Sequence, residues 1–132
     1  MTNADRVRRL FEDGWNGGRF EAVADDTAPS ITFHYNGATS ETTPEDLPRL
    51  VAMWRSGFPD LHMDLRHVIE QGDLVAVSLV LRGTHEGPWR GIDGTGRTVA
   101  VEEMMFFRFA DGVVVEMWEV FDEQGLFAQI SR

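Results

Sequence analysis

The chain has 132 residues, of which 42% are hydrophobic, and its formal net charge is -10. This length suits one domain over residues 1–132, with enough apolar content for a core. Phosphate groups repel such a charge, so nucleic acid and anionic membranes are disfavoured partners. No apolar run approaches the ~20 residues of a membrane span. The absence of cysteine excludes disulfides and thiolate chemistry and fits a cytoplasmic protein.

The first half of the chain is mainly helical in pattern. Apolar residues recur at helical spacing over residues 4–15, and a second short helix is expected over 20–24. A short strand over residues 31–35 follows. The next helix is expected over residues 44–58, because a proline begins it and another proline stops it.

The second half predicts four long strands over residues 61–69, 74–81, 99–109 and 113–121, then a short helix over 123–130. Helices followed by an antiparallel meander indicate the α+β class. We expect N-terminal helices packed on a strongly bent antiparallel sheet. Such a cone-shaped α+β barrel would enclose a cavity on the concave side.

The last two strands are joined by Asp111-Gly112, a strong hairpin signal. A regular two-residue loop puts Glu103 and Met105 on one face with Trp118 and Asp122. Glu103 and Asp122 are then diagonal neighbours, roughly 7–8 Å apart. Apolar neighbours would desolvate Glu103 and raise its pKa toward values useful in proton transfer. The alternatives are a solvated strand face for Glu103, or a β-bulge that exchanges the faces at one end.

Both faces of this hairpin are mostly apolar. One is expected to face the helices and the cavity. The other needs a cover, and little chain remains to provide it. A second copy of the chain is the natural cover, which predicts a homodimer through the sheet.

Short motifs in a fixed order cover nearly the whole chain, roughly residues 5–130. As an ordered set they resemble the SnoaL-like polyketide cyclases of the nuclear-transport-factor-2-like (NTF2-like) superfamily. The motifs are Phe58-Pro59-Asp60-Leu61, Gly72-Asp73, Arg82-Gly83-Thr84-His85, Gly91-Ile92, Thr95-Gly96-Arg97, Phe107-Arg108-Phe109, Asp111-Gly112, and Glu116 with Trp118-Glu119-Val120-Phe121-Asp122.

The resemblance implies a cone-shaped α+β fold and cofactor-free aldol ring closure on polyketide esters. In that family a pocket carboxylic acid acts as general acid and base, while a histidine and a polar amide hold the substrate's oxygens. The same fold also hosts isomerases, dehydratases, epoxide hydrolases and non-catalytic binders, so the fold alone does not decide the activity.

Carried over residue by residue, the resemblance matches His85 to the family's histidine and His34 with Asn36 to its polar position after the first strand. Relatives often have an acid where this chain has Met105, which cannot move a proton. Glu103, two residues earlier on the same face, could replace that acid.

The candidate residues have structural alternatives. His85 could cap loop carbonyls, His34 could be a core histidine, and Asp122 could cap a helix. The catalytic candidates are Glu103, His85 and Asp122, and the substrate-binding candidates are His34, Asn36, Trp54, Phe58, Met105 and Trp118. The aromatic members of this set could equally belong to the core.

No histidines and acids fall at a local metal-ligand spacing, and no dinucleotide or phosphate loop occurs, so neither metal nor cofactor is expected. The expected partner is a small apolar or polycyclic molecule.

As a cyclase or isomerase, the chain would use Glu103 to remove a proton alpha to a carbonyl. His85, with His34 or Asn36, would stabilise the enolate oxygen. Asp122 would be a second acid or orient water. The alternatives are a non-catalytic binding or accessory protein, which Met105 favours, and a hydrolase or dehydratase.

Overall fold

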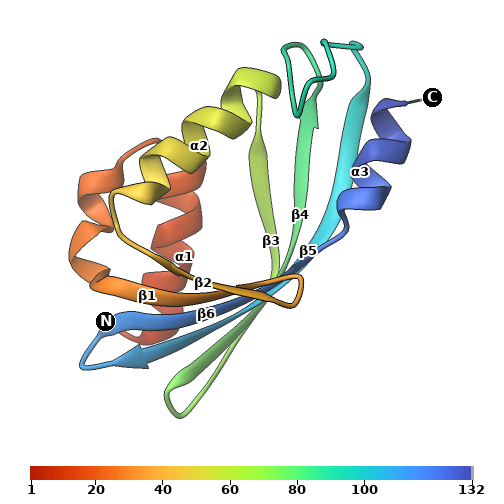
Figure 1. Ribbon diagram of the computed structural model, residues 1–132. Coiled ribbons are helices and arrows are strands. Elements are labelled where there is room, and N and C mark those ends of the chain that lie inside the picture. Colours follow the sequence, from red (N-terminus) through yellow and green to blue (C-terminus); the bar gives the residue numbers. More distant parts are fainter. Residues whose placement is uncertain (132) are drawn as a thin grey trace.

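The structure is a computed structural model and describes residues 1–131 (Figure 1). Its helical elements are α1 (Asn3–Arg9), the π-helix η1 (Leu10–Trp15), the 3-10 turns η2 (Phe20–Ala22) and η3 (Ala24–Asp26), α2 (Asp46–Gly57) and α3 (Glu123–Ile130). Its strands are β1 (Thr27–Tyr35), β2 (Ala38–Thr42), β3 (His62–Gln71), β4 (Leu74–Thr84), β5 (Thr98–Ala110) and β6 (Val113–Phe121).

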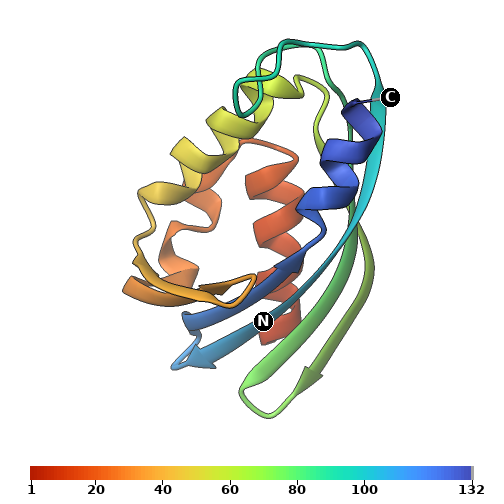
Figure 2. The ribbon, with the colours of Figure 1, turned by 45° about the vertical axis from the view of Figure 1, so that its right-hand side comes forward.

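The strands form one six-stranded sheet in the order β2-β1-β6-β5-β4-β3. The sheet is strongly bent, and α1 lies within its curve while α2 closes the upper side (Figures 1 and 2). The α+β class and the helices on a bent sheet are therefore confirmed. No helix within residues 1–131 has the length and apolar character needed to cross a membrane.

Two features of the sheet differ from the prediction. The sheet is mixed, because β1 and β6 pair in parallel while the other neighbours are antiparallel. Strand β2 was also not foreseen, since its residues are almost all exposed and polar. Local pattern can predict a strand, but the return of β6 to the side of β1 depends on how the whole chain closes.

The predicted register of the β5–β6 hairpin was wrong beyond its first two pairs. Ala110 pairs with Val113 and Phe109 with Val114, but the next pair is Arg108 with Glu116. Val115 is thus an extra residue in β6, a β-bulge. Since side chains alternate along a strand, the bulge reverses the faces of all following β6 residues.

The first helix begins at a capping box. The Asp5 amide donates to the Thr2 hydroxyl, and the Thr2 amide donates to the Asp5 carboxylate, both at 3.1 Å. The apolar face of α1, continued by η1, carries Val7, Phe11 and Trp15 into the core, where Phe11 meets Phe107 edge-on at 6.1 Å.

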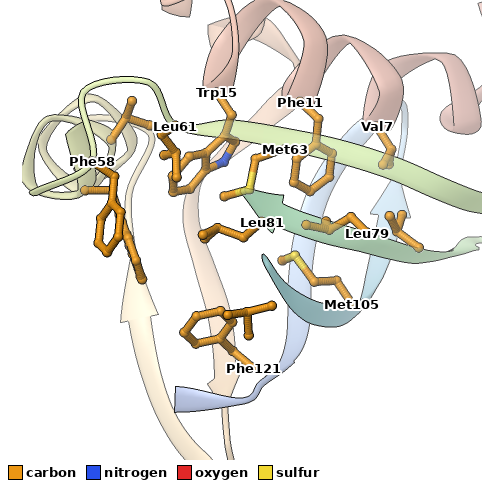
Figure 3. Packing of buried hydrophobic residues seen from close by; sticks show 14 of the residues in the cluster. Val7, Phe11, Trp15, Phe58, Leu61, Met63, Leu79, Leu81, Met105 and Phe121 are labelled. Atoms are coloured by element: carbon orange, nitrogen blue, oxygen red, sulfur yellow. The ribbon is translucent and has the colours of Figure 1, made fainter. Parts of the chain in front are cut away.

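Figure 3 shows these three side chains descending from the helix toward Met63 and Leu79 of the sheet. Each large apolar side chain buried here contributes about 1.5–3 kcal/mol to stability. The helix thereby holds one wall of the molecule at a fixed distance from the concave face of the sheet.

Candidate functional site

A cavity of about 690 Å³ lies between the helices and the concave face of the sheet. Its exposed lining residues come from η2, η3, β2, the segment leading into α2 and the first part of α2, so it opens to solvent there. Its inner wall is mainly aromatic and aliphatic. That wall includes Phe11, Trp15, Ile31, Phe33, Met63, Met105, Phe107, Val114 and Met117.

Two carboxyl groups interrupt the apolar wall. Glu103 of β5 is only 5% exposed, and Glu119 of β6 is half-buried; both line the cavity. Their positions follow from the observed register, in which Glu103 pairs with Phe121 and Met105 with Glu119. Glu103 and Glu119 are therefore diagonal neighbours on the concave face.

The two carboxyl groups are hydrogen-bonded to each other. Burial raises the pKa of Glu103 well above its usual range, and the hydrogen bond and the negative charge of Glu119 raise it further. Burial also raises the pKa of Glu119, but the bond from Glu103 opposes that rise. Burial and the neighbouring carboxyl therefore both favour the protonated form of Glu103.

The sequence analysis did not include Glu119 among the site residues, because a regular hairpin places its side chain on the face opposite Glu103. A signal was present in the spacing of the concave-facing residues Val114 and Met117, which are three positions apart instead of two. The run Val113-Val114-Val115 concealed it, because any of three identical residues could face the core.

Of the predicted site residues, the structure brings Glu103 and Met105 together at the cavity, and the others do not line it. His85 is fully buried, stacks on Phe58 at 5.3 Å, and accepts a hydrogen bond from the Thr95 amide at Nδ1. The proton of a neutral ring therefore lies on Nε2, which has no partner within residues 1–131.

Trp54 and Phe58 belong to an aromatic cluster beyond the cavity. Trp54 packs on Phe58 at 5.9 Å, on Trp89 at 5.4 Å and edge-on against Phe121 at 5.6 Å. These side chains fill one end of the barrel. They are therefore core residues, which was the alternative to a substrate-binding role.

His34 and Trp118 lie on the convex face of the sheet. Their rings stack at 5.2 Å, and His34 Nε2 lies 2.7 Å from a carboxylate oxygen of Glu116. Arg108 covers the other part of this cluster, 5.6 Å from the Trp118 ring. Neither aromatic residue has access to the cavity.

Asn36 and Asp122 hold the backbone in place. The Asn36 side chain accepts from the Phe121 amide at 2.9 Å and donates to the Phe121 carbonyl at 3.0 Å. The Asp122 carboxylate caps α3 by accepting from the Gly125 amide at 2.9 Å. Within residues 1–131, no group of three or more histidines and acids is placed to hold a metal ion.

Comparison with known proteins identifies the family of this chain. The family model of the SnoaL-like polyketide cyclases matches residues 5–130, so the chain belongs to this family, whose members have the NTF2-like fold. The aklanonic acid methyl ester cyclase DnrD of Streptomyces peucetius is 29% identical over 138 residues, covering 99% of this chain and 92% of the relative.

Solved structures agree with this fold. A SnoaL-like protein from Jannaschia sp. CCS1 is 30% identical with a TM-score of 0.85, covering 98% of this chain and 91% of that one. Wild-type IdmH from Streptomyces antibioticus is 26% identical with a TM-score of 0.88, and each chain covers 100% of the other.

Proposed function

We propose that this protein is a cofactor-free enzyme that uses acid/base chemistry to cyclise, by an aldol reaction, or isomerise a polyketide-type ketone. The observation that carries this proposal is the buried carboxyl group of Glu103 on the wall of an otherwise apolar cavity. An enzyme needs a proton donor or acceptor there, whereas a simple apolar binding site gains nothing from a desolvated acid.

The cavity suits a ligand of the proposed kind. Its volume of about 690 Å³ is that of a site for a drug-sized molecule. Aromatic side chains such as Phe11, Trp15 and Phe33 can stack on a flat, apolar ring system. The activity named for DnrD, cyclisation of aklanonic acid methyl ester, supports a polyketide-type substrate here.

Burial raises the pKa of Glu103, so this carboxyl stays protonated to higher pH than an exposed glutamate does. A protonated carboxyl can also donate a hydrogen bond to a carbonyl oxygen and stabilise the charge that develops there. The 132 residues contain no lysine. The chain therefore has no side-chain amine that could form the iminium intermediate of a lysine-dependent aldol reaction. Proton transfer by carboxyl groups is the chemistry that the cavity wall offers.

A non-catalytic binding or accessory protein is the second candidate. Met105 favours it, because this thioether lies on the cavity wall where the family resemblance places an acid. A hydrolase or dehydratase fits less well. Asp122, the residue expected to orient water, caps α3 and does not line the cavity.

We extend the proposal to a homodimer through the convex face. The observed register lines up a row of side chains across that face, namely Ile69, Ala76, Phe106, Trp118 and His34. Beside it lie Met104 and Val120, which pair with each other and are 59% and 68% exposed. A second copy would present the same apolar residues and cover both patches at once.

The test is turnover of aklanonic acid methyl ester and related polyketide esters, measured by mass spectrometry for the wild type and Glu103→Gln. Product formation by the wild type and a loss of about 10-fold or more in the variant would support the proposal. Glu102→Gln is the matched control, because this neighbouring acid is exposed on the opposite face. If both proteins bind these ligands tightly without converting them chemically, the protein is a binding protein instead.

A further inference from the structure

We propose that Glu119 is the base of the reaction and that Glu103 is the proton-bearing acid beside it. This inference rests on the proposed function and reverses the role given to Glu103 by the sequence. The β-bulge at Val115 is its structural origin. Without that extra residue, Glu119 would face outward and the cavity would contain only one buried carboxyl.

The surroundings of the pair leave it without a counter-charge. Within residues 1–131, neither carboxyl forms a salt bridge with an arginine or histidine. The negative charge of Glu123 also opposes ionisation of Glu119. Two such groups do not ionise together readily, so the pair shares one proton and one negative charge over a range of pH.

The difference in burial between the two carboxyl groups indicates which of them acts as the base. Glu103 is the more deeply buried, and Glu119 is half-buried and open to the cavity. The more deeply desolvated group keeps the proton, while the group with more access to the cavity carries the charge. Met105 faces Glu119 directly and provides an apolar wall against the reacting carbon.

The step balances without any added reagent. The Glu119 carboxylate takes the proton from a carbon next to a ketone, and the C–H electron pair forms the enolate double bond. The electrons of the C=O bond move to the oxygen, where the Glu103 hydroxyl donates its hydrogen bond. The enolate carbon then attacks a second carbonyl, and the new alkoxide takes the proton held by Glu119, which restores the carboxylate.

One experiment measures the base alone. Exchange of the α-hydrogens of 2-tetralone for deuterium, followed by NMR, reports enolisation without requiring the natural substrate. The wild type should accelerate exchange above the buffer rate. Glu119→Gln should lose about 100-fold of that acceleration and the rise of rate with pH. Glu103→Gln should keep the rise with pH, because Glu119 still ionises, and lose about 10-fold through the weaker donor.

A double variant that moves the carboxyl group from β6 to the opposite position in β5 distinguishes a catalytic role of Glu119 from a structural one. Met105 and Glu119 are directly opposed, so Met105→Glu combined with Glu119→Met moves the acid by one strand within the same wall. This double variant should recover part of the exchange rate lost in Glu119→Met alone. Retention of the wild-type rate, within about 3-fold, by Glu119→Gln would overturn the inference.

Carboxyl 13C NMR of glutamate-labelled protein tests the proton placement independently of turnover. At pH 7 the ionised resonance of the pair should be missing in Glu119→Gln, and the protonated one in Glu103→Gln. The reverse assignment overturns the inference even if the protein turns over substrate. An enzyme that fails on both 2-tetralone and the polyketide esters, while showing the expected assignment, would refute the proposed function and leave the proton placement standing.

Discussion

Met104 and Met105 are neighbours in β5 with opposite surroundings. Met104 is 59% exposed on the convex face, and Met105 is 8% exposed on the wall of the cavity. This contrast provides a matched pair of variants, because the same substitution can be made on either face of one strand.

Met105→Trp should fill part of the cavity and reduce ligand binding. The added ring occupies space that an apolar ligand needs, whereas Met104→Trp adds the same ring outside. We expect 2-naphthol to raise the melting temperature of the wild type and of Met104→Trp but not of Met105→Trp, measured by differential scanning fluorimetry. Equal shifts in all three proteins would mean that the ligand binds elsewhere. Circular dichroism checks that both variants fold.

Glu103→Gln should make the protein less sensitive to alkaline pH. Burial raises the pKa of Glu103 in the folded state above the ordinary 4.5, so the folded chain holds this proton more tightly than the unfolded chain does. The resulting stabilisation is fully present below the unfolded pKa and is lost as the pH rises through the folded pKa. Glutamine cannot ionise and avoids that loss.

Urea unfolding at pH 5 and pH 8 measures this difference. The wild type should lose at least about 1 kcal/mol more stability than Glu103→Gln over this interval. Glu102→Gln, on the exposed face of the same strand, should behave as the wild type does. Parallel pH profiles for the wild type and Glu103→Gln would contradict the raised pKa.

Phe106→Glu should separate the proposed homodimer. Phe106 is 51% exposed at the centre of the convex apolar row, and a charge buried there without a partner costs several kcal/mol in the assembly. Light scattering coupled to size-exclusion chromatography should show half the molar mass of the wild type. Met53→Glu, on the exposed side of α2, is the control and should leave the dimer intact. A wild type that is already monomeric would refute the proposal.

Asn36→Ala should lower stability and leave ligand binding unchanged. Its side chain makes two hydrogen bonds to the Phe121 backbone, and its φ of 46° lies in the left-handed region that alanine disfavours. The loss should be about 2 kcal/mol in urea unfolding. A variant of normal stability that no longer responds to 2-naphthol would instead place Asn36 in the binding site.

Much of the architecture could be read from local pattern. The apolar spacing of Val7, Phe11 and Trp15 predicted the first helix, and Asp111-Gly112 predicted the last hairpin turn. The same pattern could not select the partner of β1. That choice depends on contacts between segments far apart in the chain, for which no local signal exists.

The sequence by itself determined the α+β class, most of the helices and strands, and the family, and it offered Glu103 as a candidate acid that could be buried or solvated. Only the tertiary structure decided which side chains meet that acid. A single extra residue at Val115 reverses a strand's faces, so it moved Trp118 to the convex face and brought Glu119 to the cavity. The physical reason is the two-residue repeat of a β-strand: one inserted residue leaves the strand pattern intact and reverses the direction of every side chain after it.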